Sequence, residues 1–222
     1  NSQNTAVLGK YKISKNSAGL CSNNSFNPTN SEMINFYRKI GRLFAIISCL
    51  SGNMVYGQDY FFANFNADTI LPEEWNVVTT GNTISHWKGQ APFIYNFTDL
   101  TMLGSNYVIC NGDAGGLGSV TNSVLTSPVV NTASAPSLFL EFDQYYRDYT
   151  GTQTDSGIVE VFNGTNWIRI LSQIETVGAG DAPFKTKINI SAYKNANLKV
   201  RFQLVGDWPY YWLLDNIRIF TP

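Results

Sequence analysis

Two carboxylates, Glu141 and Asp143, are the first residues whose types and spacing could do chemistry. Side chains two apart in an extended strand point to the same face, and a pair of carboxyl groups can serve as the acid and the nucleophile of glycoside hydrolysis. That arrangement needs a further carboxylate in register, yet the segment 144–147 carries none and Asp148 is in the wrong phase. The pair therefore indicates a solvated strand face with Lys or Arg partners rather than a catalytic centre.

Nucleophilic catalysis has no supporting pattern in the chain. His86 is the only histidine, so no site can combine two imidazoles, and Cys110 has no evident neighbour to activate its thiol. The chain lacks a Gly-x-Ser-x-Gly turn, and the glycine-rich stretch 112–118 lacks the Lys-Ser or Lys-Thr of a phosphate loop. We therefore expect that the chain is not an enzyme.

Aromatic side chains give the best indication of a binding surface. Exposed rings stack on sugar faces or anchor protein partners. One group of tyrosines lies near the end of an expected strand, and Trp208-Pro-Tyr-Tyr-Trp212 precedes another. The predicted ligand-binding residues are Tyr145, Tyr146, Tyr149, Trp208, Tyr210 and Tyr211. The alternative for each ring is a place in the core, which is where we expect Trp75, Trp87 and Trp167.

The elements that must position these residues are strands. After Asp59 the chain shows no clear helical periodicity, whereas runs of period two recur between Gly, Pro and Asn breaks, which predicts an antiparallel β-sandwich. Asn163-Gly164, between two such runs, predicts a hairpin turn with positive φ values. The nine runs are 75–79, 106–110, 123–127, 138–142, 158–162, 167–171, 185–190, 198–204 and 211–219.

The phase of the alternation predicts which side chains point inward. In 198–204 the apolar residues alternate with the polar residues. One face of this strand is therefore expected to pack against the core, and the other face to be exposed to solvent. In 211–219 Asp215 shares its phase with Tyr211, Leu213, Ile217 and Ile219. This carboxylate must therefore be met by backbone donors, a cationic side chain or a metal ion.

Charge is distributed unevenly along the 222 residues, although the net charge is only −1. Charged residues make up 14% of the chain, as do aromatic residues. Residues 1–57 carry a net charge of +5 and residues 58–222 carry −6. The balance excludes a nucleic-acid binder with a basic face and leaves an acidic, ring-rich domain suited to cations or sugars.

The segment 33–57 has the pattern of a secretory signal peptide. A cationic stretch from Met33 to Arg42 precedes eight apolar residues ending at Leu50, and eight residues are too few for a membrane-spanning helix. We expect cleavage after Gly57; alternatives are a lipidated N-terminus at Cys49 or an amphipathic helix of the fold. Residues 1–32, rich in Asn and Ser, are expected to be an unstructured or non-native upstream segment.

Several segments of 58–222 carry a family resemblance when taken in order. They are Phe62-Ala-Asn-Phe65-Asn66, Leu71-Pro72-Glu-Glu-Trp75, His86-Trp87, Ser105-Asn-Tyr107, Val124-Leu-Thr-Ser-Pro128, Leu138-Phe-Leu-Glu-Phe142, Val159-Glu-Val161 with Asn163-Gly164 and Trp167, and Trp212-Leu-Leu-Asp215-Asn-Ile217. The domain resembles the cleaved-adhesin and choice-of-anchor J modules of secreted Bacteroidota proteins, relatives of the MAM jelly roll. The resemblance implies a jelly-roll β-sandwich over 58–222.

The resemblance also implies a structural calcium ion. The family's closing acidic residue matches Asp215, a further acidic position matches Asp113, and Asn66 stands where the family usually has an acid. Calcium takes six to eight oxygen ligands, so the loss of one carboxylate at Asn66 lowers the charge of the site. The alternative is that backbone amides satisfy Asp215 and that Asp113 shapes a turn.

Together these features predict a secreted or cell-surface, non-catalytic module that binds a glycan or a cell-surface protein. The resemblance places it on a Gram-negative bacterium of Bacteroidota type, with export by type IX secretion. The alternative is an ancillary domain of a secreted peptidase or glycosidase whose catalytic part lies outside this chain. We expect no nucleic-acid partner, no membrane span in the mature chain, and further domains in the same polypeptide.

Overall fold

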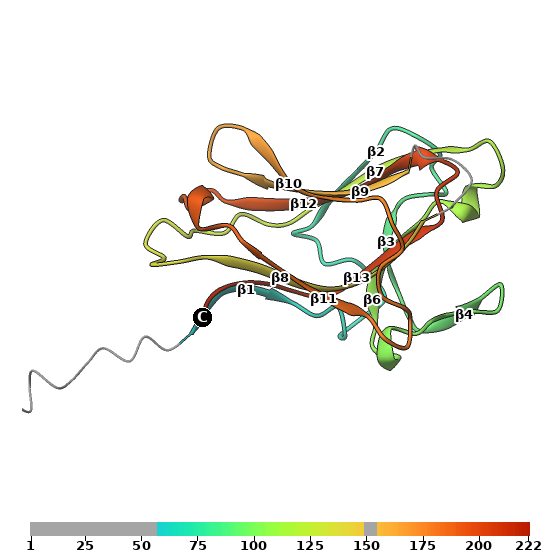
Figure 1. The fold of residues 1–222 in the computed structure, drawn as a ribbon, viewed down its shortest axis with the longest axis horizontal. Coiled ribbons are helices and arrows are strands. Elements are labelled where there is room, and N and C mark those ends of the chain that lie inside the picture. The colour runs from blue at the N-terminus through green and yellow to red at the C-terminus, as the bar shows by residue number, and fades with distance from the viewer. Residues whose placement is uncertain (1–56, 149–154) are drawn as a thin grey trace, which may run out of the picture. The chain divides into compact units, whose positions relative to one another are not determined.

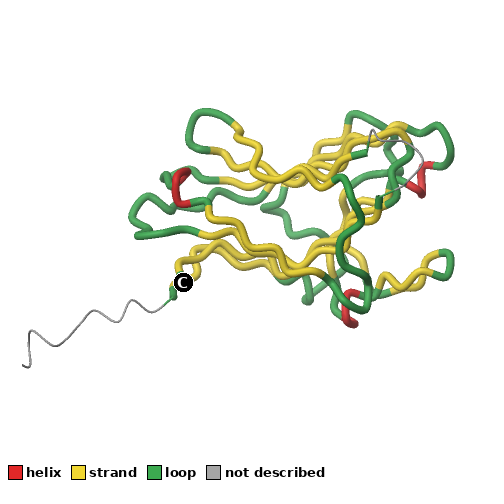
Figure 2. The backbone as a smooth tube through the Cα atoms, in the orientation of Figure 1, coloured by secondary structure: helices red, strands yellow, loops and turns green. Residues whose placement is uncertain are grey.

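The computed structural model describes residues 57–148 and 155–222, which form two antiparallel β-sheets packed face to face (Figures 1 and 2). Predictions that concern residues 1–56, including Cys49, and the predicted binding residue Tyr149 lie outside the described residues. The strands are β1 (Gln58–Ala63), β2 (Asn76–Thr79), β3 (Trp87–Gln90), β4 (Phe93–Tyr95), β5 (Thr98–Leu100), β6 (Tyr107–Asn111), β7 (Val120–Thr126), β8 (Phe139–Arg147), β9 (Ser156–Phe162), β10 (Trp167–Gln173), β11 (Phe184–Asn189), β12 (Lys199–Asp207) and β13 (Tyr211–Thr221).

Helical structure in the described residues is limited to three short 3₁₀ turns, which are drawn red in Figure 2. They are η1 (Met102–Gly104), η2 (Asp113–Gly115) and η3 (Ser191–Tyr193). The described part of the chain contains no helix long and apolar enough to cross a membrane. The predicted class, an all-β antiparallel sandwich, is confirmed, and each of the nine predicted runs overlaps a strand.

Each sheet is built around a long strand from the C-terminal part of the chain. The six-stranded sheet has the order β11-β8-β13-β6-β3, and the five-stranded sheet has the order β10-β9-β12-β7-β2. β8 lies along one edge of β13, while β6 and β1 share the other edge, because β6 pairs with the first half of β13 and β1 with the second. β1 therefore lies at an outer edge of the six-stranded sheet.

Aromatic rings from both sheets fill the space between them. Trp212 is fully buried at the centre and contacts Trp87, Tyr146 and Phe202 at ring-centroid distances of 5.8, 5.9 and 5.9 Å. Its indole Nε1 donates to Gln144 Oε1 at 2.9 Å, so the polar atom of the largest core side chain is satisfied. Trp75 and Trp87 are buried, as predicted.

Trp167 was predicted in the core, and this prediction is wrong. It pairs with Phe162 on β9, and both rings lie on the outer face of the five-stranded sheet, where the Arg201 guanidinium lies 4.2 Å above the Trp167 ring. The inward phase of β9 belongs instead to Val159 and Val161. The Arg201 side chain covers one face of the indole and shields it from solvent, so Trp167 is stabilised at the end of the hairpin without entering the core.

The hairpin between β9 and β10 is confirmed, but its turn differs from the predicted one. Among its residues only Gly164 has a positive φ, of 97°. The Asn163 side chain accepts hydrogen bonds from the amides of Thr165 and Asn166, and the Asn163 amide donates to the Asn166 carbonyl. Asn163 therefore shapes the turn through its side chain rather than through a left-handed backbone.

Alternation in the sequence placed Tyr211, Leu213, Asp215, Ile217 and Ile219 on one face of β13. This prediction is wrong because the strand contains a bulge. Its register against β8 shifts between Asp215 and Arg218, and Asn216 has a φ of 51°. Trp212 and Leu214 point into the sandwich before the bulge, and Ile217 and Ile219 do so after it. Asp215 therefore lies on the outer face of the six-stranded sheet, although its side chain is still buried.

A short hairpin, β4–β5, covers part of that outer face. Buried residues of the hairpin segment and of the sheet form a second apolar cluster, made of Leu100, Met102, Tyr107, Ile109, Tyr145, Tyr211 and Leu213. The turn of the hairpin, Asn96-Phe97, has positive φ at both residues. This hairpin was not predicted, since three-residue strands carry almost no alternation signal.

Candidate functional site

A small open pocket of about 210 Å³ lies where the tip of the β4–β5 hairpin meets the ends of β6, β8 and β13. Figure 1 shows β4 extending beyond the six-stranded sheet at this end of the domain. The pocket combines aromatic rings, one cation and one carboxylate. Its lining residues are Tyr95, Asn96, Thr98, Asp113, Arg147, Tyr210 and Tyr211.

Arg147 is held in the pocket by contacts from three elements. Its Nη1 donates to Thr98 Oγ1 at 3.1 Å and to the Tyr211 hydroxyl at 3.2 Å, and its guanidinium carbon lies 4.8 Å from the centre of the Tyr210 ring. Nη2 carries two more N–H donors on the same planar group. The contacts fix the orientation of the guanidinium before any ligand arrives, which lowers the entropy lost on binding.

Tyr95 and Asp113 form the opposite side of the pocket. The Tyr95 hydroxyl donates to Asp113 Oδ2 at 2.9 Å, and the Asp113 amide donates to the Tyr210 carbonyl at 3.2 Å. Burial raises the pKa of the Tyr95 hydroxyl, and the bond to Asp113 raises it further, so Tyr95 stays a neutral donor. The pocket thus offers hydrogen-bond donors and a carboxylate acceptor beside aromatic rings.

The predicted aromatic residues divide between this pocket and the interior. Tyr210 and Tyr211 line the pocket, and Tyr145 is buried beneath it with its ring 5.5 Å from that of Tyr211. Tyr146 points the opposite way into the sandwich and is fully buried, so its assignment to a ligand site is wrong. Neighbouring residues of a strand face opposite sides, so Tyr145 and Tyr146 cannot share a surface. Trp208 does not line this pocket.

Sequence reasoning missed Tyr95, Thr98 and Arg147 as site residues. Arg147 lies two residues after Tyr145 in the same strand, so its phase was available from the alternation of β8. Tyr95 and Thr98 flank the Asn96-Phe97 turn, and nothing in their local sequence indicates that the hairpin folds back over β13. Their role depends on a tertiary contact.

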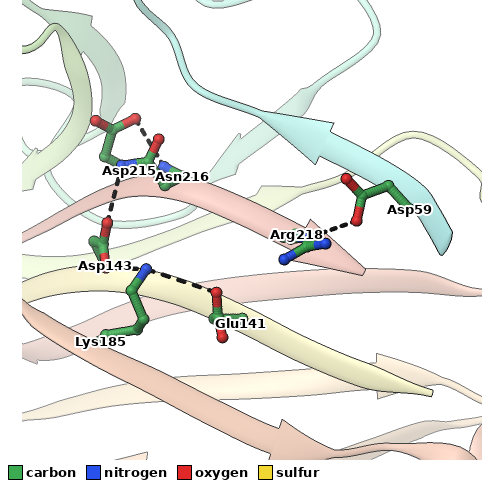
Figure 3. Close-up of polar contacts among 7 residues, drawn as sticks. All are labelled: Asp59, Glu141, Asp143, Lys185, Asp215, Asn216 and Arg218. Carbon is green, nitrogen blue, oxygen red and sulfur yellow. Dashed lines mark hydrogen bonds and ion pairs between the residues drawn. The ribbon is translucent and has the colours of Figure 1, made fainter. Parts of the chain in front are cut away.

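A second group of polar residues surrounds Asp215 on the same outer face (Figure 3). Asp215 pairs across the strands with Asp143, whose carboxylate contacts Lys185 Nζ at 2.8 Å and accepts from Asn216 Nδ2 at 2.9 Å. Asp215 itself accepts hydrogen bonds from the Ser105 hydroxyl at 2.8 Å and from the backbone amide of Asn216 at 2.8 Å. Figure 3 shows Lys185 also reaching Glu141, so both carboxylates of β8 have a cationic partner.

Burial raises the pKa of the Asp215 carboxyl, and the Asp143 charge adds to that effect. The bonds from Ser105 and the Asn216 amide oppose the shift, as does the Lys185 charge. The net direction is upward, so the protonated form of Asp215 is favoured relative to a solvated aspartate. Backbone donors, a cationic side chain or a metal ion were expected to meet this carboxylate. Of these, the backbone amide of Asn216 bonds it, and the Ser105 hydroxyl is a further donor that was not expected.

The residues predicted to bind calcium are not all brought together. The Asn66 carbonyl accepts from Asn106 Nδ2 at 3.4 Å, next to the residue that bonds Asp215, so Asn66 and Asp215 lie in one region. Asp113 lies beyond the other end of β6, in the aromatic pocket. Among the described residues no group of three or more His, Cys, Asp or Glu side chains is arranged to hold a metal ion. Asp113 therefore lies apart from Asn66 and Asp215, whereas Asp143 places a second carboxylate beside Asp215.

His86 and Cys110 are the remaining residues with reactive side chains. His86 Nδ1 lies 2.7 Å from the Thr83 carbonyl within a turn. Cys110 is buried at the sandwich core, and this burial raises the pKa of its thiol, so the thiol stays protonated. The buried, protonated Cys110 thiol therefore provides no activated nucleophile.

Comparison with known proteins shows what this arrangement is similar to. No family model matches the chain, and no curated protein matches it. Among solved structures, the K2 cleaved adhesin domain of Lys-gingipain is 18% identical with a TM-score of 0.53, over 73% of this chain and 97% of that chain. The K1 domain of Lys-gingipain from Porphyromonas gingivalis W83 is 17% identical with a TM-score of 0.51, over 72% of this chain and 96% of that chain.

The fold is also shared with a carbohydrate-binding module. TmCBM61, solved in complex with beta-1,4-galactotriose, is 14% identical with a TM-score of 0.51, over 74% of this chain and 99% of that chain. These identities show a common fold and no more. The expectation of a cleaved-adhesin-like sandwich is confirmed at the level of the fold.

Proposed function

We propose that residues 58–222 form a non-catalytic glycan-binding module of a secreted or cell-surface protein, acting in adhesion or as the ancillary domain of a secreted hydrolase. The observation that carries this proposal is the preorganised Arg147, clamped over the Tyr210 ring inside a pocket that also holds Asp113. The fold shared with adhesin domains and a carbohydrate-binding module supports it.

The chemistry of the pocket matches that of a sugar. Sugar hydroxyls both donate and accept hydrogen bonds, so one hydroxyl can accept from Arg147 while a neighbouring hydroxyl donates to Asp113. The apolar face of the ring can then lie against the tyrosine rings. At about 210 Å³ the pocket is smaller than the usual site for a drug-sized ligand, which favours one terminal or branching sugar over a long chain.

The state of the carboxylates supports a role without catalysis. Glu141 and Asp143 share the Lys185 ammonium on the open face of the sheet, and Asp113 is bonded by Tyr95. A glycosidase needs one carboxyl group with a raised pKa and a second free to attack or to activate water on the same substrate. Asp215, whose pKa burial raises, is itself buried, and its neighbour Asp143 is paired with Lys185, so these carboxylates indicate a structural network instead.

A glycan array followed by calorimetric titration of the best ligand tests the proposal. Tyr210→Ala and Arg147→Met remove the stacking surface and the fixed donors, and each should weaken binding by at least about tenfold, which corresponds to ~1.4 kcal/mol. Trp167→Ala, on the outer face of the other sheet, is the matched control and should bind like the unaltered protein. Retention of binding in the two pocket variants would refute this site, as would an equal loss of binding in the control.

A structural calcium ion is a separate proposal that rests on the donors around Asp215. The carboxylates of Asp143 and Asp215, the Asn66 carbonyl and the Ser105 hydroxyl are oxygen donors of the kinds that calcium prefers. A bound ion would neutralise the two facing carboxylates and tie the 105–106 loop to β13. Without the ion, Lys185 offsets the charge of Asp143, while the Ser105 hydroxyl and the Asn216 backbone amide donate hydrogen bonds to Asp215.

A further inference from the structure

A second concave surface lies at the side of the sandwich, away from the aromatic pocket. It is a groove of about 660 Å³ between β1 and the chain that leads from β1 to β2. In Figure 1 this chain crosses from the layer of the six-stranded sheet to the layer of the five-stranded sheet. The lining residues are Phe61, Phe62, Ala63, Asn64, Phe65, Ala67, Asp68, Ile70, Leu71, Pro72, Glu73, Glu74, Trp75 and Pro128.

The groove has a rigid aromatic floor. Phe65 and Trp75 are 7% exposed, and the Trp75 ring lies 5.6 Å from that of Phe65 and 5.8 Å from that of Phe61. Phe62 and Ile70, by contrast, remain 50% and 73% exposed. Large apolar side chains gathered around a concavity indicate a binding surface rather than scattered surface residues.

The edge of β1 opens onto this groove. The last three residues of β1, Phe61–Ala63, line it, and because neighbouring strand residues face opposite sides, a cavity that touches all three lies against the edge of the strand. β1 pairs with β13 on its inner side, and in the described part of the chain no strand pairs with its outer side. Phe65 has a φ of 28°, which turns the chain away from β1 at the end of the strand.

The charged residues that line the groove are all acidic. Asp68, Glu73 and Glu74 line it and are exposed, while none of its lining residues in the described chain is Lys, Arg or His. A surface that presents carboxylates of one sign around an apolar floor favours a partner with basic and apolar side chains.

We propose that this groove binds an extended peptide with alternating basic and apolar side chains, which adds to the outer edge of β1 as a further strand. Main-chain hydrogen bonds to β1 supply sequence-independent affinity. The alternation directs the apolar side chains of the peptide toward the Phe65 and Trp75 rings and the basic side chains toward Glu73 and Glu74. This site is separate from the proposed glycan pocket and does not depend on it.

Fluorescence anisotropy with a labelled Lys-Val octapeptide of alternating sequence tests the proposal on the full chain. We expect saturable binding, and we expect Glu73→Lys combined with Glu74→Lys to weaken it at least about tenfold, because two attractive charges become repulsive. The matched control combines Glu175→Lys with Asp181→Lys, which changes the net charge equally at two exposed residues outside the groove. The control should bind within about twofold of the unaltered protein.

Two further peptides separate edge pairing from simple charge attraction. The same peptide N-methylated at alternate residues cannot donate hydrogen bonds to β1 and should lose binding, and a Glu-Val octapeptide should not bind. Hydrogen exchange at the amides of β1 should slow when the Lys-Val peptide binds. Equal binding of the N-methylated peptide, equal weakening in the control variant, or no binding of the Lys-Val peptide would each overturn the proposal.

Discussion

Replacement of Asp215 by Asn should leave the domain folded and as stable as the wild type at neutral pH, although Asp215 is a buried carboxylate. The reason lies in Ser105, whose hydroxyl oxygen is 2.9 Å from the Met102 carbonyl and 2.8 Å from Asp215 Oδ2. A hydroxyl has one proton and cannot donate to both acceptors. An ionised Asp215 therefore competes with the Met102 carbonyl for the Ser105 proton.

An asparagine removes this competition. Its oxygen can still accept from the Asn216 amide, as Asp215 Oδ1 does at 2.8 Å, and its amide nitrogen can donate to Ser105, which leaves the Ser105 proton for the Met102 carbonyl. We expect the free energy of unfolding of Asp215→Asn to lie within about 0.5 kcal/mol of wild type, or above it, at pH 7. Asp215→Ala leaves the Asn216 amide without this acceptor and should cost about 1–3 kcal/mol.

The same variant should change how stability depends on pH. Because burial raises the folded-state pKa of Asp215, the folded protein binds more protons than the unfolded chain between the unfolded pKa, near 4, and the higher folded value. The contribution of Asp215 to stability is therefore largest below about pH 4, falls as pH rises through this window, and then levels off. Asparagine does not titrate, so any stability advantage of Asp215→Asn should be present at pH 7 and shrink towards pH 4.

Urea unfolding from pH 4 to 7 in the presence of a calcium chelator measures both effects. The chelator is needed because a bound ion would stabilise the charged form of Asp215. A loss of more than about 2 kcal/mol in Asp215→Asn at pH 7, or a difference from wild type that does not change with pH, would refute the reasoning.

Three other predictions concern the scaffold and the proposed calcium ion. Gly89→Ala should destabilise the domain by about 1–3 kcal/mol in urea unfolding, because the new Cβ would lie 2.3 Å from the Thr69 carbonyl oxygen; unchanged stability would mean that this loop moves freely. Thr121→Val should raise stability by about 1 kcal/mol, since the buried Oγ1 has no hydrogen-bond partner among the described residues; a loss would reveal an unrecognised one. Calcium at 100 times its dissociation constant should raise the unfolding free energy of wild type by about 2.7 kcal/mol and that of Asp215→Asn by less; no shift in the melting midpoint of wild type would contradict a structural ion.

Local sequence patterns were sufficient for most of the strands and for two residues of the candidate pocket. In β12 the alternation of Val200, Phe202 and Leu204 with polar residues predicts the buried face, and all three are fully buried. Tyr210 and Tyr211 were predicted as site residues and line the pocket. Of the strands that were missed, β3, β4 and β5 are too short to show alternation, so their pairing partners decide their conformation.

The inward-facing residues of β13 could not be predicted from alternation alone, because a bulge interrupts the strand. The pattern of Tyr211, Leu213 and Ile217 implies one continuous face, yet the register shift after Asp215 moves the first two to the outer face and Ile217 to the core. A bulge adds one residue to one strand and reverses the facing of every residue after it. No residue type in Leu214-Asp-Asn-Ile217 reveals the shift without the partner strand.

The sequence by itself determined the class of this domain: a β-sandwich of alternating strands, acidic over 58–222, with its aromatic residues near two strand ends. Only the tertiary structure decided which rings share a surface and which carboxylates are neighbours. It brought Tyr95 and Arg147 together across 52 positions of the chain and separated Asp113 from Asp215. The physical reason is that alternation depends on adjacent residues, whereas a site depends on which distant strands pair and in which register.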